Sequence, residues 1–191
     1  WPSDNTDPIE RLFIQWGFSQ VFPAKTMCAH VTTWNKNSSV KFRTDVAMMC
    51  KLGFDIKLAD MSKDDETYCR TAVQNYNRLK PVVLEGDMYR LVSPYGSNHT
   101  STMYVGKDKD KAVVFAFDIH PRYAEKTLPV RLQGLDADKM YRVKEINLMP
   151  GANSSLSGNG EVFSGEFLMN VGLNLFTTQQ LNSRVIEVVA E

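Results

Sequence analysis

The sequence predicts an α/β unit with parallel strands followed by an all-β unit, and we place the division between residues 1–81 and 82–191. Two observations carry this prediction. Up to Pro81, apolar residues at helical spacing alternate with short buried runs, in the order helix, strand, helix, strand, helix. After Pro81 only short strand-like runs remain, and turn residues separate them at the spacing of an antiparallel β-sandwich.

The start of the first helix is marked by Asp7, Pro8 and Glu10. Asp caps free amide groups, Pro fits the first turn, and Glu completes a capping box. We expect this helix to end at Gly17. Its apolar face at helical spacing comprises Ile9, Leu12, Phe13 and Trp16.

The remaining elements of the first unit follow from apolar runs and their punctuation. We expect strands at residues 26–31 and 54–58, a helix over 42–52 closed by Gly53, and a helix from Ser62 to about Lys80, ended by Pro81. Two parallel strands need cover on both faces. This unit is therefore expected to be unfinished or to dock on the second.

The second unit consists of six expected strands separated by turn residues. They are residues 88–92, 102–105, 112–119, 128–132, 141–146 and 184–189. The stretch from Gly151 to Gly160 is rich in Gly, Asn and Ser, which is typical of a hairpin loop.

Composition excludes several classes of partner. The 191 residues carry zero formal net charge and no basic stripe, which argues against nucleic acid. No apolar run is long enough to span a membrane. The three cysteines lack the spacing of a zinc site and are an odd number, so we expect buried free thiols. The chain starts with Trp1 rather than Met, so we expect it to begin inside a longer product.

The strongest candidate for chemistry is Asp4. It lies in the loop before the first helix, and it has no capping role of the kind that occupies Asp7. In a barrel of alternating strands and helices, such a loop lies on the catalytic rim. Trp1 would supply an apolar wall that favours the proton-donating form of the carboxyl group. From the residues alone, however, a solvated or capping role is the more common one for such an Asp.

Several motifs, in order along the chain, resemble bacterial α-galactosidases of glycoside hydrolase family thirty-six. The first is W-P-S-D-N-T-D with Arg11-Leu12, and the next are Phe22-Pro23 and M-C-A-H-V at residues 27–31. Later ones are G-F-D at 53–55, Y-R-L at 89–91 with Ser93-Pro94, L-Q-G-L-D at 132–136 with Tyr141, and the stretch from Ser164 to Asn170. Together they cover nearly the whole chain, although Cys28 stands where the family usually has Gly.

This resemblance implies the C-terminal portion of a (β/α)8 TIM barrel, around strands seven and eight, followed by an antiparallel β-sandwich domain. It also implies a retaining hydrolase of terminal α-galactosides such as raffinose and melibiose, with Asp4 as the general acid/base and no cofactor or metal. The family's W-D-x-N-R nucleophile segment is absent from this sequence. We therefore expect the chain alone to be inactive and to need the N-terminal part of the same polypeptide.

Other residues have weaker claims to the site. Trp1 and His30 are candidates for substrate binding, although a buried, hydrogen-bonded histidine is the more common case. Asp55 and Lys57 are expected to form an ion pair or to reach the site, and we favour the ion pair. Trp34 would stack on a sugar ring or pack on the surface.

Two alternatives to an α-galactosidase remain open at this point. A non-catalytic carbohydrate- or protein-binding module would need exposed aromatic residues aligned on one sheet face, and a related α-N-acetylgalactosaminidase would differ in residues outside this chain. A homo-oligomer through the sandwich is a further hypothesis. The resemblance implies a parent protein of the bacterial cytoplasm or periplasm.

Overall fold

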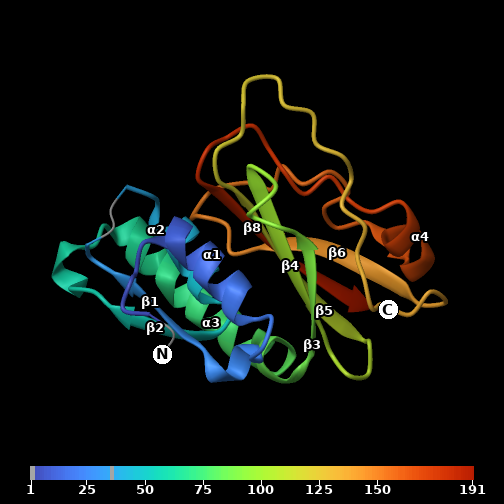
Figure 1. Ribbon diagram of the computed structural model, residues 1–191, viewed down its shortest axis with the longest axis horizontal. Helices are drawn as coiled ribbons and strands as arrows, with labels where there is room; N and C mark the ends of the chain where they lie inside the picture. The colour runs from blue at the N-terminus through green and yellow to red at the C-terminus, as the bar shows by residue number, and fades with distance from the viewer. Residues whose placement is uncertain (1–2, 35–36) are drawn as a thin grey trace.

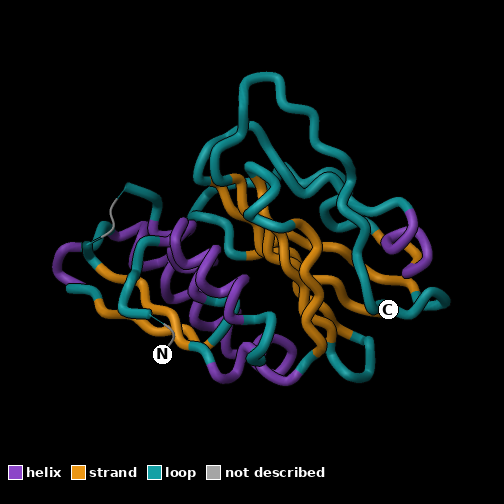
Figure 2. The backbone as a smooth tube through the Cα atoms, in the orientation of Figure 1, coloured by secondary structure: helices purple, strands orange, loops and turns teal. Residues whose placement is uncertain are grey.

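The computed structural model describes residues 3–34 and 37–191. Helices α1, α2 and α3 form a layer between a two-stranded parallel sheet and a six-stranded antiparallel sheet (Figure 1). Loops and the short helix α4 cover the far side of the larger sheet (Figure 2). The predicted fold class, a barrel end followed by a β-sandwich, is confirmed.

The first half contains three helices and two strands, with short 3-10 turns between them. Their bounds are α1 Pro8–Phe18, η1 Ala24–Thr26, β1 Cys28–Thr32, α2 Val40–Ala47, β2 Lys51–Asp55, η2 Leu58–Asp60 and α3 Lys63–Glu85. Side-chain caps begin each helix, from Asp7, Ser39 and Ser62 respectively. The caps predicted at Asp7 and Ser62 are confirmed.

The prediction that Gly53 closes the second helix is wrong. Helix α2 ends at Ala47, and Gly53 lies in the middle of β2, opposite His30 of β1 in the parallel pair. Met48 and Met49 are good helix formers on their own, but here they are buried in the connection between helix and strand. Tertiary packing and pairing with β1 outweigh that local preference.

Helix α3 also differs from its predicted end. It passes through Pro81 and stops at Glu85. A proline inside a helix removes one hydrogen bond and crowds the preceding turn, at a cost of about 3 kcal/mol. Burial of Val82, Val83 and Leu84 against the core offsets this cost. The predicted boundary between the units 1–81 and 82–191 thus lies inside α3. The division of the chain into these two units stays a prediction.

The second half is one antiparallel sheet with α4 at its outer face. Its elements are β3 Asp87–Val92, β4 His99–Val105, β5 Lys111–Asp118, β6 Met140–Ile146, β7 Val162–Ser164, α4 Gly165–Asn170 and β8 Asn182–Ala190, and the strand order is β3-β4-β5-β8-β6-β7. The strand predicted at residues 128–132 is wrong, because this segment makes only an isolated bridge between Val130 and Leu173. Helix α4 was not predicted.

The central strands of this sheet are buried on both faces. Phe115 and Val185 pack against the helices, whereas their neighbours Val114 and Ile186 pack beneath the outer layer. Continuous apolar runs are typical of strands covered on both sides. Because the helices pack on both sheets, the two halves share one core.

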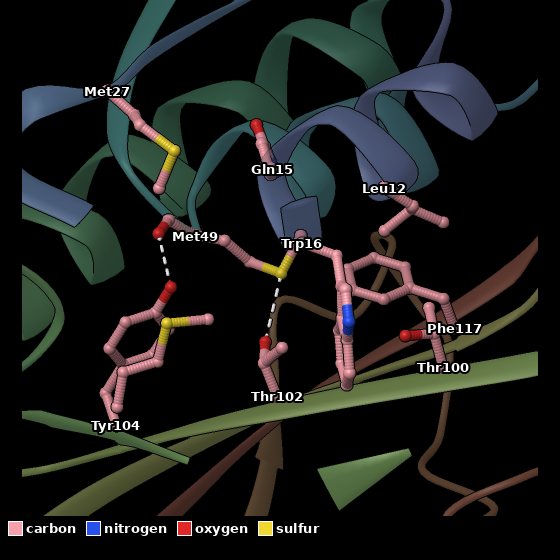
Figure 3. Close-up of a pocket in the computed structure, with 10 residues that line it drawn as sticks. Leu12, Gln15, Trp16, Met27, Met49, Thr100, Thr102, Tyr104 and Phe117 are labelled. Carbon is pink, nitrogen blue, oxygen red and sulfur yellow. Dashed lines mark hydrogen bonds between the residues drawn. The ribbon is translucent and has the colours of Figure 1, made fainter. Parts of the chain in front are cut away.

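Helix α1 and the connection between α2 and β2 together contact the antiparallel sheet (Figure 3). The Tyr104 hydroxyl donates to the Met49 carbonyl at 2.7 Å, and the Thr102 hydroxyl lies 3.2 Å from the Met49 sulfur. The remaining space beside Leu12 and Trp16 is only about 10 Å³. A cavity of this size holds about one water molecule. The interface therefore behaves as a protein interior.

A buried carboxylate joins the helices to the sheet. Asp45 of α2 is fully buried and accepts four hydrogen bonds, at 2.6 Å from Lys41, 2.8 Å from Tyr68, 3.1 Å from Asn147 and 2.7 Å from Ser183. Tyr68 lies on α3, Asn147 follows β6, and Ser183 lies on β8. Burial, together with the charge of Asp45, raises the pKa of Tyr68 well above its usual range. Asp45 therefore connects elements from both halves of the chain.

We predict that Asp45→Ala lowers the free energy of unfolding by about 3–5 kcal/mol, the usual cost of removing one partner of a buried ion pair. The substitution leaves the Lys41 charge and three donors without their acceptor. Chemical denaturation measures the change. Lys107→Ala is the control, because Lys107 pairs with Asp87 at an exposed site and should change stability by less than about 1 kcal/mol. Equal effects of the two substitutions would contradict the role of Asp45.

Candidate functional site at the strand ends

The segment from Ser3 to Asp7 is a sequence of interlocking turns. The Ser3 hydroxyl accepts from the Asn5 amide at 3.1 Å, and the Asn5 side chain accepts from the Asp7 amide at 2.8 Å. The Asp7 carboxylate then caps α1 by accepting from the amides of Ile9 and Glu10, both at 3.0 Å. Each short polar side chain fixes the backbone two or three residues ahead. The loop therefore has a defined shape.

This loop is attached to the C-terminal end of β1. The hydroxyl groups of Thr6 and Thr32 lie 3.2 Å apart, and Thr32 is the last residue of β1. The loop that carries Asp4 thus lies beside the ends of the parallel strands, where barrel enzymes gather their catalytic groups. The location of Asp4 predicted from the sequence agrees with this arrangement.

The carboxylate of Asp4 differs from the other polar groups of the loop. Asp4 is exposed, and it makes no hydrogen bond or ion pair with any residue that the structure describes. Contacts of Ser3 and Asn5 hold its backbone on both sides, whereas its side chain contacts no polar group of the described residues. Trp1, predicted as an apolar wall and substrate contact, lies outside the described residues.

Arg11 connects the loop to the start of β1. Its guanidinium donates to the Ser3 carbonyl at 3.2 Å, to the Cys28 carbonyl at 2.9 Å and to the Gln15 side chain at 3.3 Å. Arg11 is only 3% exposed, and burial lowers its pKa. In the sequence, Arg11 contributes to the family resemblance, but its contact with the loop was not predicted.

The buried stripe of α1 contained a signal for it. The stripe comprises Pro8, Arg11, Leu12 and Gln15, whereas Ile9, Phe13 and Trp16 of the predicted face are only half-buried. Arg11 and Gln15 are separated by one helical turn and flank the apolar position Leu12. Polar residues on the inner face of an amphipathic helix indicate a buried polar contact.

His30 lies on the same face of β1 as Cys28 and Thr32, because side chains alternate along a strand. Ala29 and Val31 point the other way, into the core beneath the helices. His30 is half-buried, and its ring packs over Gly53 of β2. It therefore faces the side of the strand from which Thr32 contacts the Asp4 loop.

Three other candidates lie at the same ends of the strands but are not gathered around Asp4. Trp34 is 73% exposed in the loop after β1. Asp55 and Lys57 are both exposed, and among the described salt bridges none joins them, so the favoured ion pair is not formed. Strand β2 ends at Asp55, and the chain then enters a 3-10 turn, which breaks the expected alternation.

A cavity of about 310 Å³ lies among the strand ends and the starts of α2 and α3. Its polar lining combines hydroxyl groups with charges of both signs, from Thr32, Thr33, Ser38, Ser39, Arg43, Lys57, Asp60 and Asp65. Burial lowers the pKa of Arg43, which donates to the Thr32 carbonyl at 2.5 Å. Such a lining suits a neutral, hydroxyl-rich ligand.

Other kinds of site find less support in the described part of the chain. No group of three or more His, Cys, Asp or Glu side chains there is arranged to hold a metal ion. None of the described helices has both the length and the apolar character that crossing a bilayer requires. A binding module would need exposed aromatic residues on one sheet face, but four aromatic residues of the strands are buried in the core, namely Tyr104, Phe115, Phe117 and Tyr141.

Comparison with known proteins finds the same family along most of the chain. Residues 1–86 match the Melibiase family, and residues 99–188 match the glycosyl hydrolase family 36 C-terminal domain. Alpha-galactosidase 2 of Hypocrea jecorina is 34% identical over 192 residues, which cover 97% of this chain and 24% of that protein. The chain thus spans about a quarter of the length of the curated relatives it matches.

Solved structures of the α-galactosidase AgaA from Geobacillus stearothermophilus share the fold of the whole chain. A variant in complex with raffinose superposes with a TM-score of 0.86 at 27% identity, and covers 100% of this chain with 26% of its own. A second variant, in complex with stachyose, gives a TM-score of 0.87 at 29% identity, with the same coverage.

The contact between Gly53 and His30 gives a prediction for the site. A Cβ atom at Gly53 would lie 2.5 Å from Cδ2 of His30, so Gly53→Ala must displace the ring. We expect a loss of about 1–3 kcal/mol of stability, as for other overpacked sites, and an altered environment of the His30 ring. Chemical denaturation and the histidine NMR signals measure the two effects.

Gly96→Ala is the matched control, since nothing lies within 4 Å of a Cβ atom at Gly96. It should leave both stability and the His30 signals unchanged. An unshifted His30 signal in Gly53→Ala would contradict the packing described here.

Proposed function

The chain belongs to glycoside hydrolase family 36, and from that premise we propose that it forms the acid/base side of the active site of a retaining α-galactosidase. The observation that carries the proposal is the Asp4 loop. Its backbone is fixed by turns and by contacts with both ends of β1, whereas its carboxylate is uncommitted. A group that gives up and regains a proton in each cycle needs this combination of fixed position and free oxygens.

The reaction is a double displacement between two carboxylates about 5–5.5 Å apart. A nucleophile from the part of the parent protein outside this chain attacks the anomeric carbon, while Asp4 protonates the departing oxygen. Asp4 then takes a proton from water, which hydrolyses the covalent intermediate. Because the nucleophile is supplied from elsewhere, the 191-residue chain by itself is expected to hydrolyse no α-galactoside.

Terminal α-galactosyl groups of oligosaccharides such as raffinose and melibiose are the proposed substrates. The complexes of AgaA with raffinose and stachyose support this class. The hydroxyl-rich cavity at the strand ends is also compatible with a sugar. His30, on the face of β1 that contacts the Asp4 loop, is the described residue that we propose as a sugar contact.

In the full-length parent, we predict that Asp4→Ala lowers the rate of raffinose hydrolysis by about 10²–10⁴-fold, the usual contribution of general acid–base catalysis. An added small anion such as azide should restore part of the turnover of an activated aryl α-galactoside, because it replaces water in the second step. Steady-state kinetics and the identity of the sugar product measure both effects.

Asp7→Asn is the matched control, since Asn also caps helices and the two positions share one loop. Its activity should stay within a few-fold of the wild type. If Asp4→Ala retained full activity while Asp7→Asn lost it, the acid/base would be Asp7. A wild-type parent inactive on every α-galactoside would remove the proposal altogether.

A further inference from the structure

Arg11 is a buried cation that has no acidic partner among the described residues. It is 3% exposed, and no ion pair links it to a carboxylate of the described residues. Its hydrogen bonds go to two backbone carbonyls and one side-chain amide. Burial of a charge in this way is costly, and an apolar residue of similar volume is often as stable or more so. Stability is therefore not the only effect to expect from Arg11.

The contacts of Arg11 join the Asp4 loop to strand β1. One terminal nitrogen of Arg11 binds the carbonyl of Ser3, immediately before Asp4, and the other binds the carbonyl of Cys28, the first residue of β1. The two nitrogens belong to one planar, rigid group. The guanidinium thus fixes the separation between the backbone at Asp4 and the strand that carries His30.

The contact at the other end of β1 makes this arrangement specific. Thr6 meets Thr32 at the last residue of the strand, and Arg11 joins Ser3 to its first residue. A loop held at one point can still swing about that point. Attachment at both ends of β1 prevents this rotation of the loop. Asp4 lies between the two attached residues, Ser3 and Thr6.

We propose that Arg11 is a positioning residue for the reaction, which holds the Asp4 carboxylate at the correct distance from the departing oxygen. This proposal rests on the proposed function of Asp4. Displacement of a catalytic group by about 1 Å can lower a rate by about 10²-fold. The effect of losing Arg11 should therefore appear in the protonation step and not in substrate binding.

The test uses Arg11→Lys in the full-length parent. Lysine keeps the charge, but its single ammonium group lacks the planar fork that reaches both carbonyls. We expect kcat/KM for raffinose to fall by roughly 10–100-fold through kcat, with little change in KM. An aryl α-galactoside with an acidic phenol leaving group needs little protonation, so its kcat/KM should change by only a few-fold.

Arg184→Lys is the matched control. Arg184 is 4% exposed and also donates to two backbone carbonyls, of Asn174 and Leu175, and it lies 3.8 Å from the Glu145 carboxylate. It lies on β8, away from the Asp4 loop. Arg184→Lys should lower thermal stability, while kcat/KM for raffinose and for the aryl α-galactoside should change by the same factor. If Arg11→Lys fails to fold, Arg11→Met, which fills the site without charge, carries the same comparison.

The possible outcomes are distinct. Unequal losses on the two substrates for Arg11→Lys, resembling in kind those of Asp4→Ala, support the proposal. Equal losses of kcat/KM on both substrates, or no loss, overturn it. If Asp4→Ala still lowers kcat/KM for raffinose more than for the aryl α-galactoside, the function of Asp4 stands. If Asp4→Ala lowers kcat/KM equally for both substrates, the assignment of Asp4 fails, and the proposal for Arg11 fails with it.

Discussion

The carboxylate of Asp45 is the interaction on which the arrangement of the two halves depends. Helices α2 and α3 lie between two sheets, and the hydrophobic effect that favours their burial is non-directional. Four directional hydrogen bonds to Asp45, from α2, α3, the end of β6 and β8, fix their position. The position of the parallel strands β1 and β2 is fixed in turn, because α2 packs on both of them. The location of the strand ends, and so of the candidate site, follows from this buried charge.

Much of this architecture was readable from local sequence, because local chemistry determines it. The caps at Asp7 and Ser62 and the strands between turns depend on residues close together in the chain. The position of Asp4 before a capped helix belongs to the same class of signal. In each case the stabilising partner lies within a few residues, so the pattern can be recognised without knowledge of the fold.

The predictions were wrong or missing where a residue far away in the sequence determines the local structure. Gly53 is required by the ring of His30, which lies on another strand, and the helix passes through Pro81 because the residues beyond it are buried in the shared core. Residues 128–132 have strand-like composition, yet their partner Leu173 follows a helix and gives only one bridge. The bonds from Arg11 to Ser3 and Cys28 likewise span 8 and 17 residues. Sequence periodicity can place a residue such as Arg11 on a buried face, but it does not identify the partner of that residue.

The carboxylates of the chain illustrate why Asp4 is suited to proton transfer. Asp45 accepts four hydrogen bonds, and Asp118 accepts from His99, Thr177 and Asn182. Asp7 accepts two amides as a helix cap. Protonation of a carboxylate weakens the hydrogen bonds that it accepts, so proton transfer at Asp45 or Asp118 would reduce the stability of the fold. The Asp4 carboxylate has no such bonds among the described residues. The contacts that hold its loop are made by the neighbouring residues Ser3 and Asn5. The loop thus separates the groups that hold it in place from the carboxylate that we propose as the acid/base.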